Sequence, residues 1–235
     1  MKLKDMDIVY VVKDAVYNEE LQYSLRSVEK NFPHNRVWFF GGRPIGVHPD
    51  KQVIVNQVWH TKWDNVRNML RMIASNDEIT DDFVLFNDDF FVMKPVKTLP
   101  PYKWKSMESI CKWVEEQNNN RVSSYTKNLR AVARELKELQ FPTDNYVLHI
   151  PMVFNKKNLL NALDVFPNTK SPRSVYGNMY CTKKAKTHKD VKIFRARTEP
   201  PKDSDFLSTE DFAFKNGKVG EYIKSCFPSK SRFEK

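Results

Sequence analysis

The sequence predicts an α/β protein built on a mostly parallel sheet with helices on both faces. The first observation is the order of segments in the first hundred residues, where short runs of β-branched and aromatic residues alternate with segments of helical apolar spacing. The second is that residues 83–86, Phe-Val-Leu-Phe, are uniformly apolar, as in a strand buried on both faces. The order strand, helix, strand, strand, helix, strand favours parallel pairing.

Each element of the first half has a local signal. Strands are expected over residues 7–12, 36–40, 51–58 and 83–86. Asn18 is a suitable cap for a helix over 19–32, with two glutamates in its first turn and Pro33 at its end. Thr61 is expected to cap a second helix, with an apolar stripe at helical spacing.

The second half is less regular, and it predicts a helical and irregular part next to the α/β layer. Helices are expected over 106–116, 125–140, 155–163, 211–214 and 221–226, and strands over 146–153 and 191–194. We therefore divide the chain into residues 1–100, which form the α/β half, and residues 101–235, and we expect the two halves to pack as one domain.

Composition excludes several classes of protein. The chain has 235 residues, 40% of them hydrophobic, which is enough for a sizeable core. No stretch approaches the roughly 20 apolar residues of a membrane span, and the first residues lack the pattern of a signal peptide. Its three cysteines show no Cys-x-x-Cys spacing, so neither a zinc ribbon nor a disulfide framework is indicated, and a cytoplasmic location is expected.

The net charge of +10 is concentrated in one segment. Residues 170–202 carry ten Lys or Arg and only two acidic residues. A basic segment of this kind attracts the phosphates of nucleotides, nucleic acid or lipid, although a solubilising surface loop has the same composition.

Polar residues follow three of the expected strands. They are Lys13-Asp14, Gly41-Gly42-Arg43 and Asn87-Asp88-Asp89. Ligands of α/β sheets bind at the carboxyl ends of the strands, so these three placements indicate a site. Adjacent carboxylates are hard oxygen ligands that suit Mg²⁺ or Mn²⁺, whereas Asn and Asp also form ordinary tight turns. Neither a dinucleotide-binding nor a P-loop glycine motif is present.

Three segments resemble a known family. They are Glu20 to Pro33 (ELQYSLRSVEKNFP), Val37 to Gly42 (VWFFGG) and Val84 to Pro95 (VLFNDDFFVMKP). Together they resemble the nucleotide-sugar-binding half of GT-A-fold glycosyltransferases, and in particular the second conserved region of the Stealth family of sugar-phosphate transferases. Residues 146–152 and 206–214 resemble later regions of that family. The expected first motif is absent, because the first strand ends in Val-Lys-Asp, and the short chain is similar to small phage-type members.

The resemblance implies a GT-A-like layer, a nucleotide-sugar donor, with a UDP-sugar expected first, and a divalent ion, Mn²⁺ or Mg²⁺. In such enzymes the ion at the strand end neutralises the leaving diphosphate. Asp89 and then Asp88 are the expected metal ligands. Asn87 is expected at the donor sugar or at a metal-bound water, and because it replaces a carboxylate the metal site is expected to be weak.

Several further side chains are candidates for the site. Phosphate or nucleotide contacts are expected from Lys13, Arg43, Asn65, Arg67 and Arg173, each of which can equally be an ordinary surface group.

Three candidates remain for catalysis. His149 lies in an apolar run, so it is either a satisfied core residue or a group on the metal or acceptor side. Glu210 and Asp211 are either the acidic first turn of a helix after a Ser-Thr cap or a general base for an acceptor hydroxyl.

Three functions are consistent with these expectations. The first is a glycosyltransferase acting on a hydroxyl acceptor, for which the basic segment suggests an anionic molecule, such as DNA with a hydroxylated base, in a bacterial or phage-infected cell. The second is a Stealth-like hexose-1-phosphate transferase acting on a glycan. The third is a non-enzymatic, basic nucleic-acid-binding protein with a degenerate site.

Overall fold

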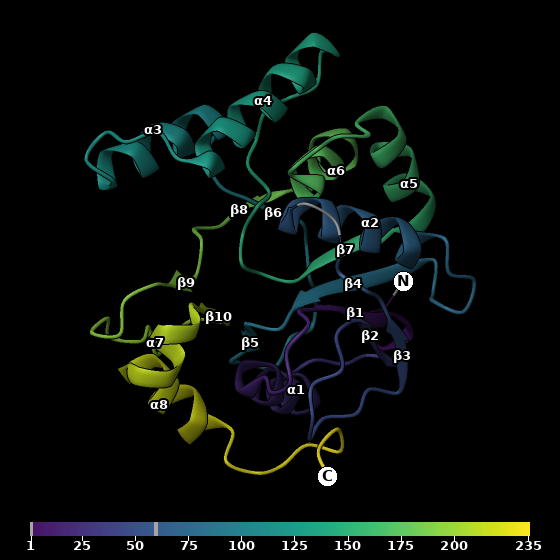
Figure 1. Cartoon of the computed structure of the whole chain (residues 1–235), viewed down its shortest axis with the longest axis vertical. Helices are drawn as coiled ribbons and strands as arrows, with labels where there is room; N and C mark the ends of the chain where they lie inside the picture. The colour runs from purple at the N-terminus through teal and green to yellow at the C-terminus, as the bar shows by residue number, and fades with distance from the viewer. Residues whose placement is uncertain (1, 59–60) are drawn as a thin grey trace.

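The computed structural model describes residues 2–58 and 61–235, and a five-stranded sheet lies at its centre (Figure 1). The strands run in the order β3-β2-β1-β4-β7, and all neighbours are parallel except β4 and β7. Their bounds are β1 Asp7–Val12, β2 Val37–Gly41, β3 Lys51–Ile54, β4 Asp82–Asn87 and β7 Met152–Asn155. The mixed α/β fold class with a mostly parallel sheet is therefore confirmed.

A short 3₁₀ helix, Leu3–Asp5, precedes β1, and eight α-helices accompany the strands in the described part of the chain. They are α1 Glu19–Asn31, α2 Lys62–Ala74, α3 Met107–Gln117, α4 Ser124–Glu138, α5 Lys156–Val165, α6 Pro172–Tyr180, α7 Asp211–Asn216 and α8 Lys218–Cys226. The expected caps are confirmed for three of them, because the side chains of Asn18, Thr61 and Asn155 each accept a hydrogen bond from the backbone N–H three residues on.

The two faces of the sheet bury different helices. Side chains alternate along a strand, so Ile8, Tyr10 and Val12 point to one face and Val9 to the other. The first face packs against α1, and the second packs against the helices from α2 to α6. Helices on both faces explain why the interiors of β1, β2 and β4 are uninterrupted apolar runs that do not alternate with polar residues.

Two smaller sheets complete the fold. In the first, β10 (Phe206–Thr209) lies between β5 (Phe90–Val92) and β9 (Lys192–Ile193), and the second pairs β6 (Tyr102–Lys103) with β8 (Lys186–Thr187). A third apolar cluster joins β5 and β10 to α7 and α8. Because β5 follows β4 after two residues, the strand end at Asp88 and Asp89 lies where the central and the three-stranded sheets meet.

Three sequence predictions are wrong in detail. The strand expected over 146–153 is irregular up to Pro151, and only β7 is extended. The backbone N–H and carbonyl groups of the irregular part bond to side chains of α6 and to Asp190 instead of to a neighbouring strand. The third strand ends at Ile54, four residues early. Ser208 and Thr209 belong to β10, so Glu210 caps α7.

Candidate active site

The strand ends predicted to form a site are adjacent. Val12 of β1 is in register with Gly41 of β2, and Val11 is in register with Asn87 of β4. A Cβ atom on Gly42 would lie 2.5 Å from the backbone oxygen of Lys13, so only glycine allows the chain after β2 to approach the chain after β1 this closely. Lys13-Asp14, Gly41-Gly42-Arg43 and Asn87-Asp88-Asp89 therefore share one edge of the sheet.

The two aspartates after β4 have different partners. Asp89 is buried, and its Oδ2 atom accepts from Lys192 Nζ at 2.5 Å and from Ser208 Oγ at 3.0 Å. The Oδ2 atom of Asp88 accepts instead from Asn18 Nδ2, 2.7 Å away at the start of α1. The pair thus links β4 to α1, β9 and β10.

Negative charge is only partly compensated at this edge. Burial and the charge of Asp89 raise the pKa of Asp88 to about 6, against the lowering effect of Asn18. Burial raises the pKa of Glu20 to about 8, and Asp89, Asp88 and Asp211 add to the shift although the Thr209 hydroxyl donates to Glu20 Oε1 at 2.6 Å. Glu20 is therefore protonated at neutral pH, and Lys192 is the cation in contact with Asp89.

His149 forms a pair with Asp190. Its Nδ1 atom lies 2.8 Å from Asp190 Oδ2, and its backbone N–H donates to Asp190 Oδ1 at 2.9 Å. Burial acts to raise the pKa of Asp190, but the hydrogen bonds and charge of His149 hold it below its usual value. With Nδ1–H donating to the carboxylate, the lone pair of the neutral imidazole is on Nε2, where it can accept a proton.

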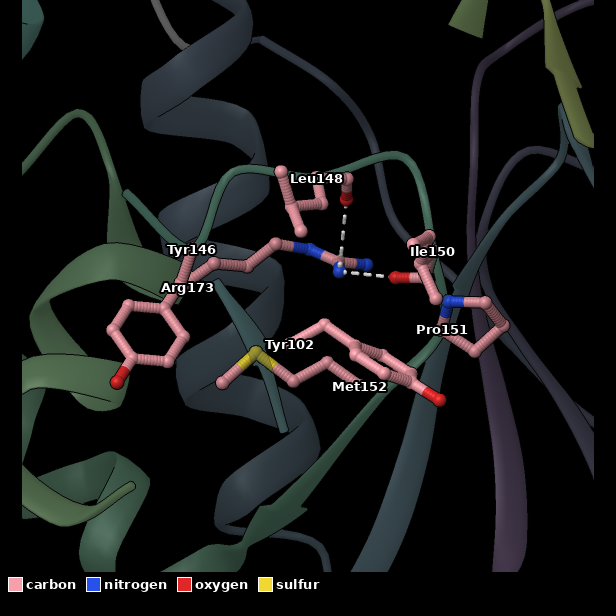
Figure 2. A pocket seen from close by; sticks show the side chains of 7 residues that line it. All are labelled: Tyr102, Tyr146, Leu148, Ile150, Pro151, Met152 and Arg173. Atoms are coloured by element: carbon pink, nitrogen blue, oxygen red, sulfur yellow. Dashed lines mark hydrogen bonds between the residues drawn. The ribbon is translucent and has the colours of Figure 1, made fainter. Parts of the chain in front are cut away.

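Arg173, on α6, is a cation close to Phe90. Figure 2 shows its guanidinium extending from α6 towards the carbonyl groups of Leu148 and Ile150, to which Nη1 donates at 3.4 and 2.7 Å. The Nη2 atom is buried and has no hydrogen-bond partner among the described residues. Burial lowers the pKa of Arg173 to about 10, while the negative charges of Asp89 and Asp190 act to raise it.

Phe90 connects the two groups of polar residues. Its ring lies edge-on to the His149 ring at 6.3 Å between centroids, and the Arg173 guanidinium lies 5.3 Å from the Phe90 centroid. Because Phe90 follows Asp89 directly, the His149–Asp190 pair is placed beside the acidic strand end.

The side chains at this strand end do not fit a divalent ion as they are arranged. Mg²⁺ takes near-octahedral oxygen coordination, and protein carboxylates supply part of it. Over residues 2–58 and 61–235, no three Asp, Glu, His or Cys side chains are grouped so that they could hold a metal. The Oδ2 atoms of Asp88 and Asp89 are engaged by an amide, an ammonium and a hydroxyl instead.

The predicted phosphate-binding residues are distributed unevenly. Lys13 and Arg43 are exposed at the sheet edge, and Asn87 is half-buried at the end of β4. Arg67 on α2 forms an ion pair with Asp64 at 2.9 Å, and the Asn65 side chain donates to the Thr61 carbonyl. Arg173 is half-buried, and its guanidinium is turned towards the Leu148 and Ile150 carbonyl groups.

Glu210 and Asp211 are placed as ordinary helix-start residues. The Glu210 side chain caps α7 by accepting from the Phe212 N–H at 3.0 Å. Asp211 is exposed and forms an ion pair with Lys215 one turn later. Of the residues predicted for catalysis, His149 is the one that the fold orients with a half-buried acid, Asp190.

The sequence prediction missed much of the site. The residues missed are Asn18, Glu20, Asp190, Lys192, Ser208 and Thr209. Asn18 and Glu20 were interpreted as a helix cap and its acidic first turn, and Lys192 as one of many basic surface residues. No signal within a few residues marks these positions as facing the strand end, because β9 begins only at Lys192 and Asp190 precedes it.

Comparison with known proteins finds similar chains among solved structures only. No protein-family profile and no curated protein matches the sequence. Among solved structures, the chain resembles an active-site mutant of LgtC, with 10% identity, a TM-score of 0.48 and 96% of each chain covered. It also resembles the glycosyltransferase GlyE of Streptococcus pneumoniae TIGR4, with 8% identity and a TM-score of 0.39 over 79% of this chain. This chain spans only 45% of the GlyE chain, and both TM-scores are below 0.5.

Two further findings concern partners. No helix in the described ranges has the length and apolar character needed to cross a bilayer. Of the ten basic residues in the segment 170–202, three are engaged within the protein. Lys170 pairs with Asp64, Lys192 pairs with Asp89, and Arg173 donates to the Ile150 carbonyl. The other seven are exposed or half-buried, and they are Lys183, Lys184, Lys186, Lys189, Arg195, Arg197 and Lys202.

Proposed function

We propose that this chain is a glycosyltransferase that moves a sugar from a nucleotide sugar to a hydroxyl group of an acceptor. The observation that carries the proposal is the His149–Asp190 pair beside the acidic end of β4, at the carboxyl edge of a parallel sheet. Inverting glycosyl transfer needs a base for the acceptor hydroxyl close to the groups that bind the leaving diphosphate, and the carboxyl edge of a parallel sheet is where such ligands bind.

Each of these groups has a role in the proposed reaction. His149 Nε2 takes the proton of the acceptor hydroxyl, and Asp190 holds the ring and stabilises the imidazolium that forms. The acceptor oxygen forms a bond with the anomeric carbon while the bond from that carbon to the diphosphate breaks, and the nucleoside diphosphate leaves with the electron pair. Lys13 and Arg43 are proposed to contact the nucleotide at the ends of β1 and β2.

The exposed basic residues of 183–202 support an anionic acceptor. Lysine and arginine side chains grip phosphates without reading sequence, so DNA with a hydroxylated base is our candidate, met in the cytoplasm of a bacterial or phage-infected cell. A base in a duplex would have to leave the stack to reach His149.

The test is mass spectrometry of an oligonucleotide with hydroxymethylated bases, after incubation with a panel of nucleotide sugars headed by UDP-sugars, together with an assay for released nucleoside diphosphate. We expect a product heavier by one hexose, and a loss of about 100-fold or more in rate for His149→Gln. His34→Gln, on a histidine at the opposite end of the sheet, is the control and should keep the wild-type rate.

Several outcomes would contradict the proposal. An added hexose plus phosphate would indicate transfer of a hexose phosphate instead. Salt-sensitive DNA binding without any release of nucleoside diphosphate would indicate a binding protein. Wild-type turnover in His149→Gln would remove His149 as the base.

A further inference from the structure

The cation at the acidic strand end is part of the chain. Lys192 Nζ lies 2.5 Å from Asp89 Oδ2, and both side chains are largely enclosed, with 15% and 12% of their surfaces exposed. An exposed ion pair contributes little, but a pair that is withdrawn from water and also receives a hydroxyl, here from Ser208, holds one geometry.

Lys192 is held in place by strand pairing and by the residues that precede it. It lies in β9, which pairs in parallel with β10, so that Lys192 is in register with Ser208. Two residues before it, Asp190 is held by His149 and by the Val191 N–H. Its ammonium is thus positioned by the same short segment that orients the proposed base.

A metal ion at Asp89 would have to displace this ammonium. Asp88 offers little compensation, because its Oδ2 already accepts a hydrogen bond from Asn18 Nδ2 at 2.7 Å. The Oε1 atom of Glu20 is likewise engaged, because it accepts a hydrogen bond from the Thr209 hydroxyl at 2.6 Å. The Arg173 guanidinium, whose Nη2 atom is buried and has no hydrogen-bond partner among the described residues, adds a second positive charge beside Phe90, the residue after Asp89. The electrostatics therefore favour an incoming anion over an incoming divalent cation.

We propose that Lys192 takes the place of a divalent metal ion, so that its ammonium meets the diphosphate of the donor and the acidic pair serves to hold that lysine. This inference rests on the proposed function for the identity of the anion. The probes that test it are UDP and GDP for the anion and Mn²⁺ for the metal.

The first measurement is calorimetric binding of UDP and GDP in EDTA and in Mn²⁺. We expect the wild-type protein to bind one of them with affinities that agree within about threefold in the two buffers, and Lys192→Met to weaken binding at least about tenfold in EDTA. Lys97→Met, on an exposed lysine outside the site, is the matched control and should bind as the wild type does.

The second measurement is titration of the protein with Mn²⁺ followed by electron paramagnetic resonance. The wild-type protein should bind no Mn²⁺ below about 1 mM. If Lys192→Met alone fails to fold, the double variant Asp89→Asn/Lys192→Met removes both charges of the ion pair, and it should show the same loss of diphosphate binding.

The outcomes separate this inference from the proposed function. Tight Mn²⁺ binding that is lost in Asp89→Asn, or diphosphate binding that requires Mn²⁺, would overturn the role of Lys192 and leave the glycosyltransferase intact. Unchanged diphosphate affinity in Lys192→Met would do the same. Absence of binding by any nucleoside diphosphate in either buffer would overturn both.

Discussion

Glu20 shows how one buried carboxyl group sets the charge of the site. Its Oε1 accepts from the Thr209 hydroxyl, which satisfies one oxygen but does not compensate a negative charge. Burial, followed by the nearby Asp89, Asp88 and Asp211, raises its pKa from 4.5 to about 8. The folded protein therefore keeps a proton on Glu20 over a pH range in which the unfolded chain has lost it.

Replacing Glu20 by Gln should flatten the pH dependence of stability. Between about pH 5 and pH 8 the folded state binds more protons at this position than the unfolded state, so the free energy of unfolding falls as the pH rises. Glu20→Gln keeps the acceptor for Thr209, and we expect it to be more stable than the wild type by about 4 kcal/mol near pH 9 and by less than about 1 kcal/mol near pH 5. Urea unfolding at both pH values measures this.

Glu19→Gln is the neighbouring control. Glu19 forms an ion pair with Lys224 at 2.7 Å, so its loss should change stability by less than about 1 kcal/mol at either pH. An equal gain for both variants, or a gain that does not depend on pH, would contradict a raised pKa of Glu20.

Helix α6 illustrates control of the site by a whole element. Gly177 lies in its interior, where a Cβ atom would approach the ring of Tyr146 to 2.3 Å. The Ser174 hydroxyl accepts from the Tyr146 N–H, and Arg173 donates to the carbonyl groups of Leu148 and Ile150. The helix thus holds the irregular segment that carries His149 through these hydrogen bonds, and the missing Cβ atom of Gly177 lets the Tyr146 ring lie against the helix backbone.

Gly177→Ala should therefore destabilise the protein although alanine favours helices. The helical preference is worth about 1 kcal/mol, whereas overpacking against a fixed ring costs about 3 kcal/mol, so a net loss of about 2 kcal/mol is expected in denaturant unfolding. In a Tyr146→Ala background the clash is absent, and the same change should be neutral or stabilising. A loss of equal size in both backgrounds would show that the ring is not the cause.

At the scale of the whole molecule, the C-terminal segment connects distant elements. It passes from α8 to α1 and the β2–β3 loop (Figure 1). Glu234 pairs with Arg26 of α1 through two hydrogen bonds of 2.8 and 2.7 Å. Phe233 is buried against the first face of the sheet, and its carbonyl accepts from the His48 N–H at 2.7 Å. Residues far apart in the chain therefore share the core under α1.

Phe233→Ala should cost about 3 to 4 kcal/mol of unfolding free energy, because it leaves a cavity beneath α1. Phe212→Ala removes the same atoms from a side chain that is 61% exposed, and it should change stability by less than about 0.5 kcal/mol. Thermal unfolding of both variants provides the comparison. Equal effects would mean that the C-terminal segment does not contribute to the cooperative core.

Local signals in the sequence were enough for most of the first half. The apolar runs of β1, β2 and β4 and the caps at Asn18 and Thr61 act within a few residues, so their positions follow from the sequence alone. The sequence likewise determined that three polar strand ends meet, because parallel strands place their carboxyl ends at one edge.

Only the tertiary structure decided which groups face those strand ends. The pairs Asp89–Lys192, His149–Asp190 and Glu20–Thr209 join residues between 41 and 189 positions apart, and no local pattern records them. The same holds for β7, because its pairing with β4 comes from the second half of the chain. Sequence periodicity reports which face of an element is apolar, whereas charge pairing depends on which elements the core brings together, and that is why the acidic turn could be found from the sequence but its lysine could not.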